Sequence, residues 1–191
     1  QPEYAAVHEH RSDLPVECIT PMMPSFASFQ WWIENSLTTW MPDFVAALQF
    51  HTVFLKMLQY GKPKKTWVLK TPVYLPVLDL VFEFFPDAWV MLTHRDPLKT
   101  LPSGMSTLAS VRWQRSDVVD LENLTAGAAG SYDLMVHVKQ RRDNGDFPDR
   151  ITDIHFLDQM RDPVAGIQKA YAKVGRTVGE THAKRIQDYL D

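Results

Sequence analysis

Cysteine is nearly absent from this sequence. Cys18 is the single cysteine among 191 residues. One thiol cannot form an internal disulfide, and it cannot by itself supply a cysteine-based metal site. The sequence therefore excludes both kinds of stabilisation, and we expect the protein to work in a reducing compartment, the cytoplasm.

Glycine is also scarce, because only eight glycines occur and the first of them is Gly61. A phosphate-binding loop needs glycines so that successive backbone N–H groups can close on the anion. Neither G-x-x-x-x-G-K-[ST] nor G-x-G-x-x-G is present. Within these residues the sequence excludes an ordinary P-loop ATPase and a Rossmann dehydrogenase.

Net positive charge and long hydrophobic runs are missing as well. The formal net charge is −3, so no overall basic field is available to bind nucleic acid or an anionic membrane. The apolar runs, such as Val77–Phe85, contain acidic residues and are much shorter than the roughly 20 residues that cross a bilayer. Gln1–Leu14 lacks the order of a secretion signal. We expect no transmembrane segment, and a chain that starts inside a longer protein.

Hydrophobic residues make up 45% of the chain, which suffices for the core of one domain. Apolar residues recur at helical spacing over 31–40 and again after Asp43, which can cap the second helix. From Thr66 onward, short apolar runs alternate with helical patterns, as in β-α-β units. We expect a single α/β domain over 1–191, with a helical, acceptor-side part (1–62) and a part built from βα units around a parallel sheet (63–191). The expected strands are Trp67–Leu69, Trp89–Leu92 and Ile151–Phe156, and the expected helices of the second part are Leu75–Phe85, 97–111, Leu121–Asp143, Asp162–Val174 and Gly179–Leu190.

Polar residues follow each expected strand, at the edge of the sheet where open α/β folds bind ligands. Lys70 comes after the first strand, Arg95 after the second, and Phe156 ends the third. Two cations at neighbouring strand ends favour a bound anion between them, and Ser103, eight residues after Arg95, can add a hydroxyl donor. Two plainer interpretations stay open. Arg95 can pair with Asp96 or another carboxylate, and Lys70 can simply extend its ammonium group into solvent.

Several short motifs together resemble the sulfotransferase family, and more closely its bacterial branch with an LK-x-P-x-H-L, FPDA, THRDP and PS pattern. The matching stretches are 67–75 (WVLKTPVYL), 85–88 (FPDA), 93–97 (THRDP) and 102–103 (PS), with a supporting segment at 153–163 (DIHFLDQMRDP). The run over 93–103 is the most specific part, and the resemblance extends over nearly the whole chain.

The resemblance implies transfer of a sulfuryl group from 3′-phosphoadenosine-5′-phosphosulfate (PAPS) to a hydroxyl or amine of a small-molecule acceptor. It implies a P-loop-NTPase-like three-layer sandwich, with a parallel sheet flanked by helices. In that family an Arg and a Ser bind the 3′-phosphate of the donor, and Arg95 and Ser103 match both in type and spacing. Lys70 matches a lysine near the reacting group. Phe156 stands where the wider family commonly has a strand-end tyrosine that contacts the adenosine, and it can stack but cannot donate a hydrogen bond.

The sequence departs from the family pattern at Tyr74 and Phe156 and at both ends. Tyr74 stands where the family has the histidine that acts as general base. Because the usual pKa of tyrosine is about 10, Tyr74 is a poor base at pH 7 unless a neighbouring cation such as Lys70 lowers that value. The N-terminal loop that holds the 5′-phosphosulfate and a C-terminal basic segment are missing, which we interpret as truncation at both ends.

Other interpretations of the chain remain open. A non-catalytic nucleotide-binding module would keep Arg95 and Ser103 without a base, and a structural domain would use the aromatic residues of the N-terminal half to bind a partner. The same aromatic residues could instead form a lipophilic acceptor pocket, and a homo-oligomer is not excluded. We expect no metal site, since His8 and His10 supply two ligands at most. His94 is expected to hold its loop in place, and His51 to be a hydrogen-bonded histidine of the core or pocket edge.

Overall fold

The computed structural model describes residues 17–18, 22, 43–113 and 117–190, and the chain divides into two compact units, Gln1–Pro86 and Asp87–Asp191. The expected helix over 31–40, the aromatic N-terminal cluster, His8 and His10 lie outside the described residues. The expectation of one domain with parts 1–62 and 63–191 stays a prediction. No helix in the described ranges is long and apolar enough to cross a membrane.

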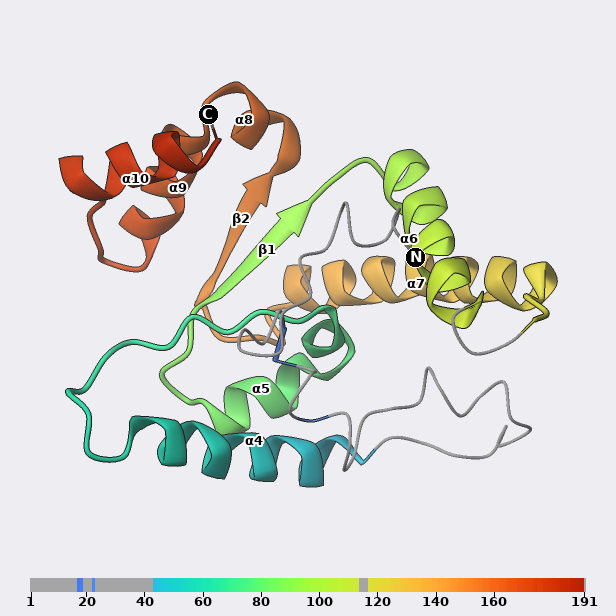
Figure 1. Ribbon diagram of the computed structural model, residues 1–191, viewed down its shortest axis with the longest axis horizontal. Helices are drawn as coiled ribbons and strands as arrows, with labels where there is room; N and C mark the ends of the chain where they lie inside the picture. The colour runs from blue at the N-terminus through green and yellow to red at the C-terminus, as the bar shows by residue number, and fades with distance from the viewer. Residues whose placement is uncertain (1–16, 19–21, 23–42, 114–116, 191) are drawn as a thin grey trace. The chain divides into compact units, whose positions relative to one another are not determined.

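The described residues of the first unit form α4 (Phe44–Gln59), the 3₁₀-helix η3 (Pro72–Val77) and α5 (Leu78–Phe84) (Figure 1). As expected, Asp43 caps α4, and its carboxylate accepts a hydrogen bond of 2.9 Å from the backbone N–H of Ala46. The helix α4 packs against α5. The buried side chains of this unit come from all three elements: Ala47, Leu48, His51, Leu55, Val73, Leu78, Val81 and Phe82, with Met22.

The expected strand Trp67–Leu69 is wrong. These residues have no regular secondary structure, and Trp67 and Val68 are 42% and 85% exposed. An extended segment becomes a strand only when a second strand takes up its backbone hydrogen bonds, and no strand among the described residues pairs with this one. The expected helix Leu75–Phe85 is present in a modified form. A 3₁₀ segment precedes α5 because Pro76 has no N–H group to donate.

The second unit contains the two-stranded sheet. The strands β1 (Val90–His94) and β2 (Ile151–His155) run parallel, with Val90 opposite Ile151 and His94 opposite His155 (Figure 1). The expected parallel order is confirmed. Because a parallel pair needs a long crossover, the two strands are joined through α6 (Pro97–Trp113) and α7 (Leu121–Asp143), which pack on each other.

Three helices follow β2. The second and third begin close to where the sequence predicts a helix, whereas the first is not predicted and begins with Phe156, the expected last residue of the strand. The helix α8 (Phe156–Arg161) starts directly after the strand, and α9 (Pro163–Lys173) packs against β2 and α10 (Glu180–Leu190). The carboxylate of Asp162 caps α9 through a 2.9 Å hydrogen bond from the N–H of Ala165. The buried residues of this unit are Leu124, Val138, Ile151, Thr152, Ile154 and Ala170. The expected α/β class, a parallel sheet flanked by helices, is confirmed.

Candidate functional site

Arg95 and Phe156 come together at the carboxyl ends of the two strands. The paired residues His94 and His155 end the strands, so the next residues of both leave the sheet at the same edge. The guanidinium carbon of Arg95 lies 4.6 Å from the centre of the Phe156 ring. A cation over an aromatic face is attracted by the negative face of the ring. The two residues therefore form one exposed surface, in which a flat aromatic ring lies beside a positive charge.

The guanidinium of Arg95 is not neutralised by its sequence neighbour. The Asp96 carboxylate instead accepts a 2.9 Å hydrogen bond from the backbone N–H of Leu98, in the first turn of α6. Arg95 forms no ion pair with any residue that the structure describes. The interpretation of Arg95 as a simple ion-pair partner of Asp96 is therefore wrong, and its donors remain available to an anion.

Ser103 lies on α6, the helix that begins two residues after Arg95. Its side chain is exposed, and its backbone carbonyl accepts a 3.0 Å hydrogen bond from the hydroxyl of Thr107. A joint site of the Ser103 hydroxyl and the Arg95 guanidinium stays a prediction.

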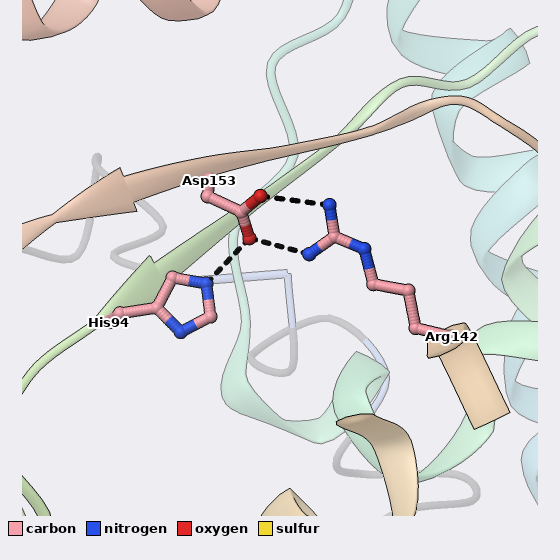
Figure 2. A network of polar contacts seen from close by, with 3 residues as sticks. All are labelled: His94, Arg142 and Asp153. Atoms are coloured by element: carbon pink, nitrogen blue, oxygen red, sulfur yellow. Dashed lines mark hydrogen bonds and ion pairs between the residues drawn. The ribbon is translucent and has the colours of Figure 1, made fainter. Parts of the chain in front are cut away.

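An ion-pair network holds the end of β1 against β2 and α7 (Figure 2). Arg142, near the end of α7, donates two hydrogen bonds to the Asp153 carboxylate, of 2.6 and 2.8 Å. The Nε2 atom of His94 lies 2.7 Å from Oδ1 of the same carboxylate. The hydrogen bonds from Arg142 hold the pKa of Asp153 well below its usual range, and His94 contributes in the same direction. Asp153 is thus a carboxylate at pH 7, to which His94 donates through Nε2.

The network positions the residue next to Arg95. The His94 ring also stacks on the ring of His155, with 5.1 Å between the ring centres. His94 therefore makes side-chain contacts to β2 that hold the strand tip, which agrees with the expectation that it fixes its loop. Sequence reasoning missed Arg142 and Asp153. A signal was available, since Asp153 is a charged residue between the buried strand residues Thr152 and Ile154, and such a residue requires a partner.

Lys70 and Tyr74 belong to the first unit, so a common site with Arg95 stays a prediction. The ammonium group of Lys70 pairs with the carboxylate of Glu17 and is 65% exposed. Backbone hydrogen bonds attach the same residue to Cys18, since the Lys70 carbonyl accepts from the Cys18 N–H at 2.8 Å. Glu17 is therefore the described residue that balances the charge of Lys70.

Tyr74 is half-buried, and its hydroxyl lies 3.0 Å from Nδ1 of His51. Burial raises the pKa of Tyr74 far above its usual value, and the Cys18 thiol, which is hydrogen-bonded to Tyr74, raises it further. Lys70 does not lower this pKa, because burial dominates and Lys70 is paired with Glu17, so Tyr74 stays the poor base that the sequence indicates. Tyr74 is thus a neutral phenol at pH 7. His51, 1% exposed, has its pKa lowered by burial and is neutral as well.

A shallow cavity of about 250 Å³ lies elsewhere in the second unit, lined by Arg142, Gly145, Phe147, Pro148, Asp149 and Ile151. Ile151 is the first residue of β2, so this cavity lies at the amino end of the sheet. Arg95 and Phe156 follow the carboxyl ends of the strands and do not line it. Among the described residues, no three His, Cys, Asp or Glu side chains are grouped in a way that could hold a metal ion.

Comparison with known proteins identifies the family. The crystal structure of the sulfotransferase STF9 from Mycobacterium avium is similar to this chain, with a TM-score of 0.69 at 20% sequence identity. The match covers 83% of this chain but 40% of the STF9 chain, so the chain spans less than half the length of that protein. No curated protein matches the chain. The family model described as "Sulfotransferase family" matches residues 2–180. The chain, which carries an arginine over an aromatic ring at the strand ends, belongs to the sulfotransferase family.

Proposed function

We propose that this chain is the nucleotide-binding part of a PAPS-dependent sulfotransferase, which moves a sulfuryl group to a hydroxyl or amine of a small-molecule acceptor. The observation that carries the proposal is the exposed guanidinium of Arg95, 4.6 Å over the Phe156 ring and without a carboxylate partner among the described residues. The ring can stack on a base, and the guanidinium can donate two parallel hydrogen bonds to a phosphate.

The remaining predicted residues have roles in the same reaction. Ser103 would add a hydroxyl donor to the 3′-phosphate from α6. Lys70 would contribute a cation near the sulfuryl group after exchanging Glu17 for the donor. Sulfuryl transfer, like phosphoryl transfer, spreads negative charge over the equatorial and leaving oxygens, so positioned cations and donors supply much of the catalysis. Tyr74 would contact the acceptor hydroxyl.

Donor binding tests the proposal through the 3′-phosphate. We expect wild-type protein to bind 3′-phosphoadenosine-5′-phosphate (PAP) more tightly than 5′-AMP, which lacks the 3′-phosphate, in calorimetric titrations. Arg95→Ala removes a charge-assisted contact of about 1.5–3 kcal/mol, so it should weaken PAP binding roughly 10- to 150-fold. The preference for PAP over 5′-AMP should shrink by the same factor.

Arg185→Ala is the matched control, because Arg185 is an exposed arginine of α10 in the same unit. It should leave both affinities within about twofold, as expected for a surface charge that contacts no ligand. Equal loss of PAP and 5′-AMP binding in Arg95→Ala would contradict the assignment of Arg95 to the 3′-phosphate. An unchanged affinity for PAP would contradict the nucleotide site altogether.

A second candidate function is a nucleotide-binding module without transfer activity. The observation that favours it is the raised pKa of Tyr74, since a neutral phenol cannot by itself accept a proton at pH 7. Transfer of labelled sulfate from PAPS to a panel of small alcohols and amines distinguishes the two candidates. Binding of PAP without any transfer by the full encoded protein would support the module and contradict the enzyme.

A further inference from the structure

His51 is a polar side chain in the interior of the first unit. It is 1% exposed, on the same helix face as the buried residues Ala47, Leu48 and Leu55. The edge of its ring contacts Phe85, with 6.1 Å between ring centres. A buried imidazole needs hydrogen-bond partners, and the partner found for Nδ1 is the Tyr74 hydroxyl at 3.0 Å. The buried imidazole is thus hydrogen-bonded to the Tyr74 hydroxyl.

Both partners of this hydrogen bond are neutral at pH 7. Tyr74 keeps its proton because burial raises its pKa, and His51 is neutral because burial lowers its pKa. With the ring hydrogen of His51 on Nε2, the phenol donates to Nδ1. The Tyr74 oxygen keeps its two lone pairs, which are available to further donors.

We propose that His51 takes up the proton of the acceptor hydroxyl through Tyr74, which relays it. This inference rests on the proposed sulfotransferase function. The acceptor oxygen forms a bond to sulfur while the bond between sulfur and the bridging oxygen of PAPS breaks, and that oxygen leaves with the electron pair. The acceptor's proton passes to the Tyr74 oxygen as the phenol's own proton passes to Nδ1 of His51. His51 ends as an imidazolium, which releases the proton through Tyr74 to solvent water after the sulfated product has left.

The relay removes the difficulty that Tyr74 poses as a base. A tyrosine acting alone would have to ionise first, which its raised pKa opposes. In the relay the phenol gives up one proton and gains another, so it never carries a negative charge. The base is the imidazole, which is neutral and able to accept a proton at pH 7. His51 acts through Tyr74 and is in this sense a positioning residue, not one that touches substrate.

Among the described residues, no charged side chain contributes to the pKa shift of His51. The titratable side chains on the segments packed around α4 are Tyr74 on η3, Asp79 and Glu83 on α5, and Glu17 and Cys18 on the segment before it. Asp79 and Glu83 are exposed, and burial is the cause that lowers the pKa of His51. A single titration on the acid side of the pH profile is therefore expected from this imidazole.

Two variants in the full encoded protein separate proton transfer from structural support. His51→Asn keeps an oxygen that accepts the Tyr74 hydrogen bond but cannot take up a proton at neutral pH. We expect kcat for PAPS-dependent transfer to fall about 10²- to 10⁴-fold, with KM for the acceptor within about threefold. Tyr74→Phe should cost a similar factor, and the double variant should cost little more, because the two residues act as one unit.

A rescue and a pH profile complete the test. Tyr74→His in the His51→Asn background places an imidazole directly at position 74, so kcat should recover by at least about tenfold. The wild-type kcat should fall toward acid pH as His51 protonates, and this fall should disappear in His51→Asn. If His51→Asn fails to fold, Tyr74→Phe replaces it, and the ¹⁵N resonances of the His51 ring are measured by NMR. We expect the Nδ1 resonance to shift in that variant while the acid limb of kcat is lost.

The outcomes separate the two claims. If kcat of His51→Asn stays within threefold of the wild-type value and the pH profile is unchanged, the relay is overturned. The proposed sulfotransferase function then remains intact. The same holds if Tyr74→Phe retains the wild-type kcat. A wild-type protein that binds PAP but transfers no sulfuryl group overturns the proposed function, and the relay with it.

Discussion

Asp153→Ala tests whether the network at the strand ends stabilises the second unit. The substitution removes two hydrogen bonds from Arg142, of 2.6 and 2.8 Å, and the 2.7 Å contact of His94. Breaking a fully buried ion pair costs about 3–5 kcal/mol, whereas an exposed pair contributes about 0–1 kcal/mol. The side chains of Asp153 and Arg142 are 29% and 32% exposed. We therefore expect a loss of about 2–3 kcal/mol in the free energy of unfolding.

Urea unfolding followed by far-UV circular dichroism measures this loss. For a chain of this size, it corresponds to a fall in Tm of roughly 4–12 °C. The matched control is Asp146→Ala, which removes a carboxylate 3.3 Å from Nε of Arg141 in a pair 42% exposed at the aspartate. The control should change the free energy of unfolding by less than about 1 kcal/mol.

The pH dependence gives the prediction a second, independent check. Arg142 lowers the pKa of Asp153 below the ordinary value of 3.8, so the unfolded chain binds a proton first as the pH falls. The stabilisation is therefore complete well above pH 3.8 and is lost as the pH falls below it. The stability difference between wild type and Asp153→Ala should narrow in that range.

Two results would refute the reasoning. The first is a loss of unfolding free energy in Asp153→Ala that equals the loss in Asp146→Ala within about 0.5 kcal/mol, which is the additivity error of distant sites. The network would then contribute no stability. The second is a difference in unfolding free energy between wild type and Asp153→Ala that stays constant as the pH falls below 3.8. A double-mutant cycle of Asp153→Ala and Arg142→Met isolates the interaction between these two side chains. We expect a coupling energy between them of about 1–2 kcal/mol, within the range for residues in one ion-pair network.

Three further predictions follow from the described side chains. The free energy of unfolding should fall as the pH rises above 10.0, because Tyr74 ionises in the unfolded chain while its raised pKa keeps it protonated in the folded protein. In urea titrations at several pH values, Tyr74→Phe should make this fall smaller. The free energy of unfolding should also fall as the pH drops below 6.5, because the unfolded chain protonates His51 while the fold resists it; an identical acid limb in His51→Asn would contradict this. Phe156→Leu should weaken PAP binding about 5- to 150-fold in calorimetry through lost stacking, with far-UV circular dichroism confirming an intact fold.

Much of the second unit could be predicted from local sequence signals. The apolar runs of β1 and β2, the aspartates that cap α7 and α9, and the glycine after α9 each act over a few residues. Gly175, for example, adopts a positive φ of 69° where the sequence predicts the end of a helix. Because α7 and α9 are bounded by such local chemistry, their ends were predictable to within a residue or two.

The segment at Trp67–Leu69 shows where local reasoning fails. Its three apolar residues read as a buried strand, yet Val68 is 85% exposed. Strand formation depends on a partner that is distant in sequence, and no local property of these residues reports whether a partner is present. The charge balance of Lys70 was unpredictable for the same reason, since Glu17 is 53 residues away in the chain.

The sequence by itself determined the α/β class, the parallel order of the strands and the placement of Arg95 and Phe156 just beyond their ends. Tertiary structure alone decided that Asp153 joins His94 to Arg142, and that the Tyr74 hydroxyl meets a buried His51. The physical reason is the range of the interactions. Helix caps and hydrophobic periodicity act between near neighbours, whereas strand register and burial select hydrogen-bond partners and shift pKa values across tens of residues.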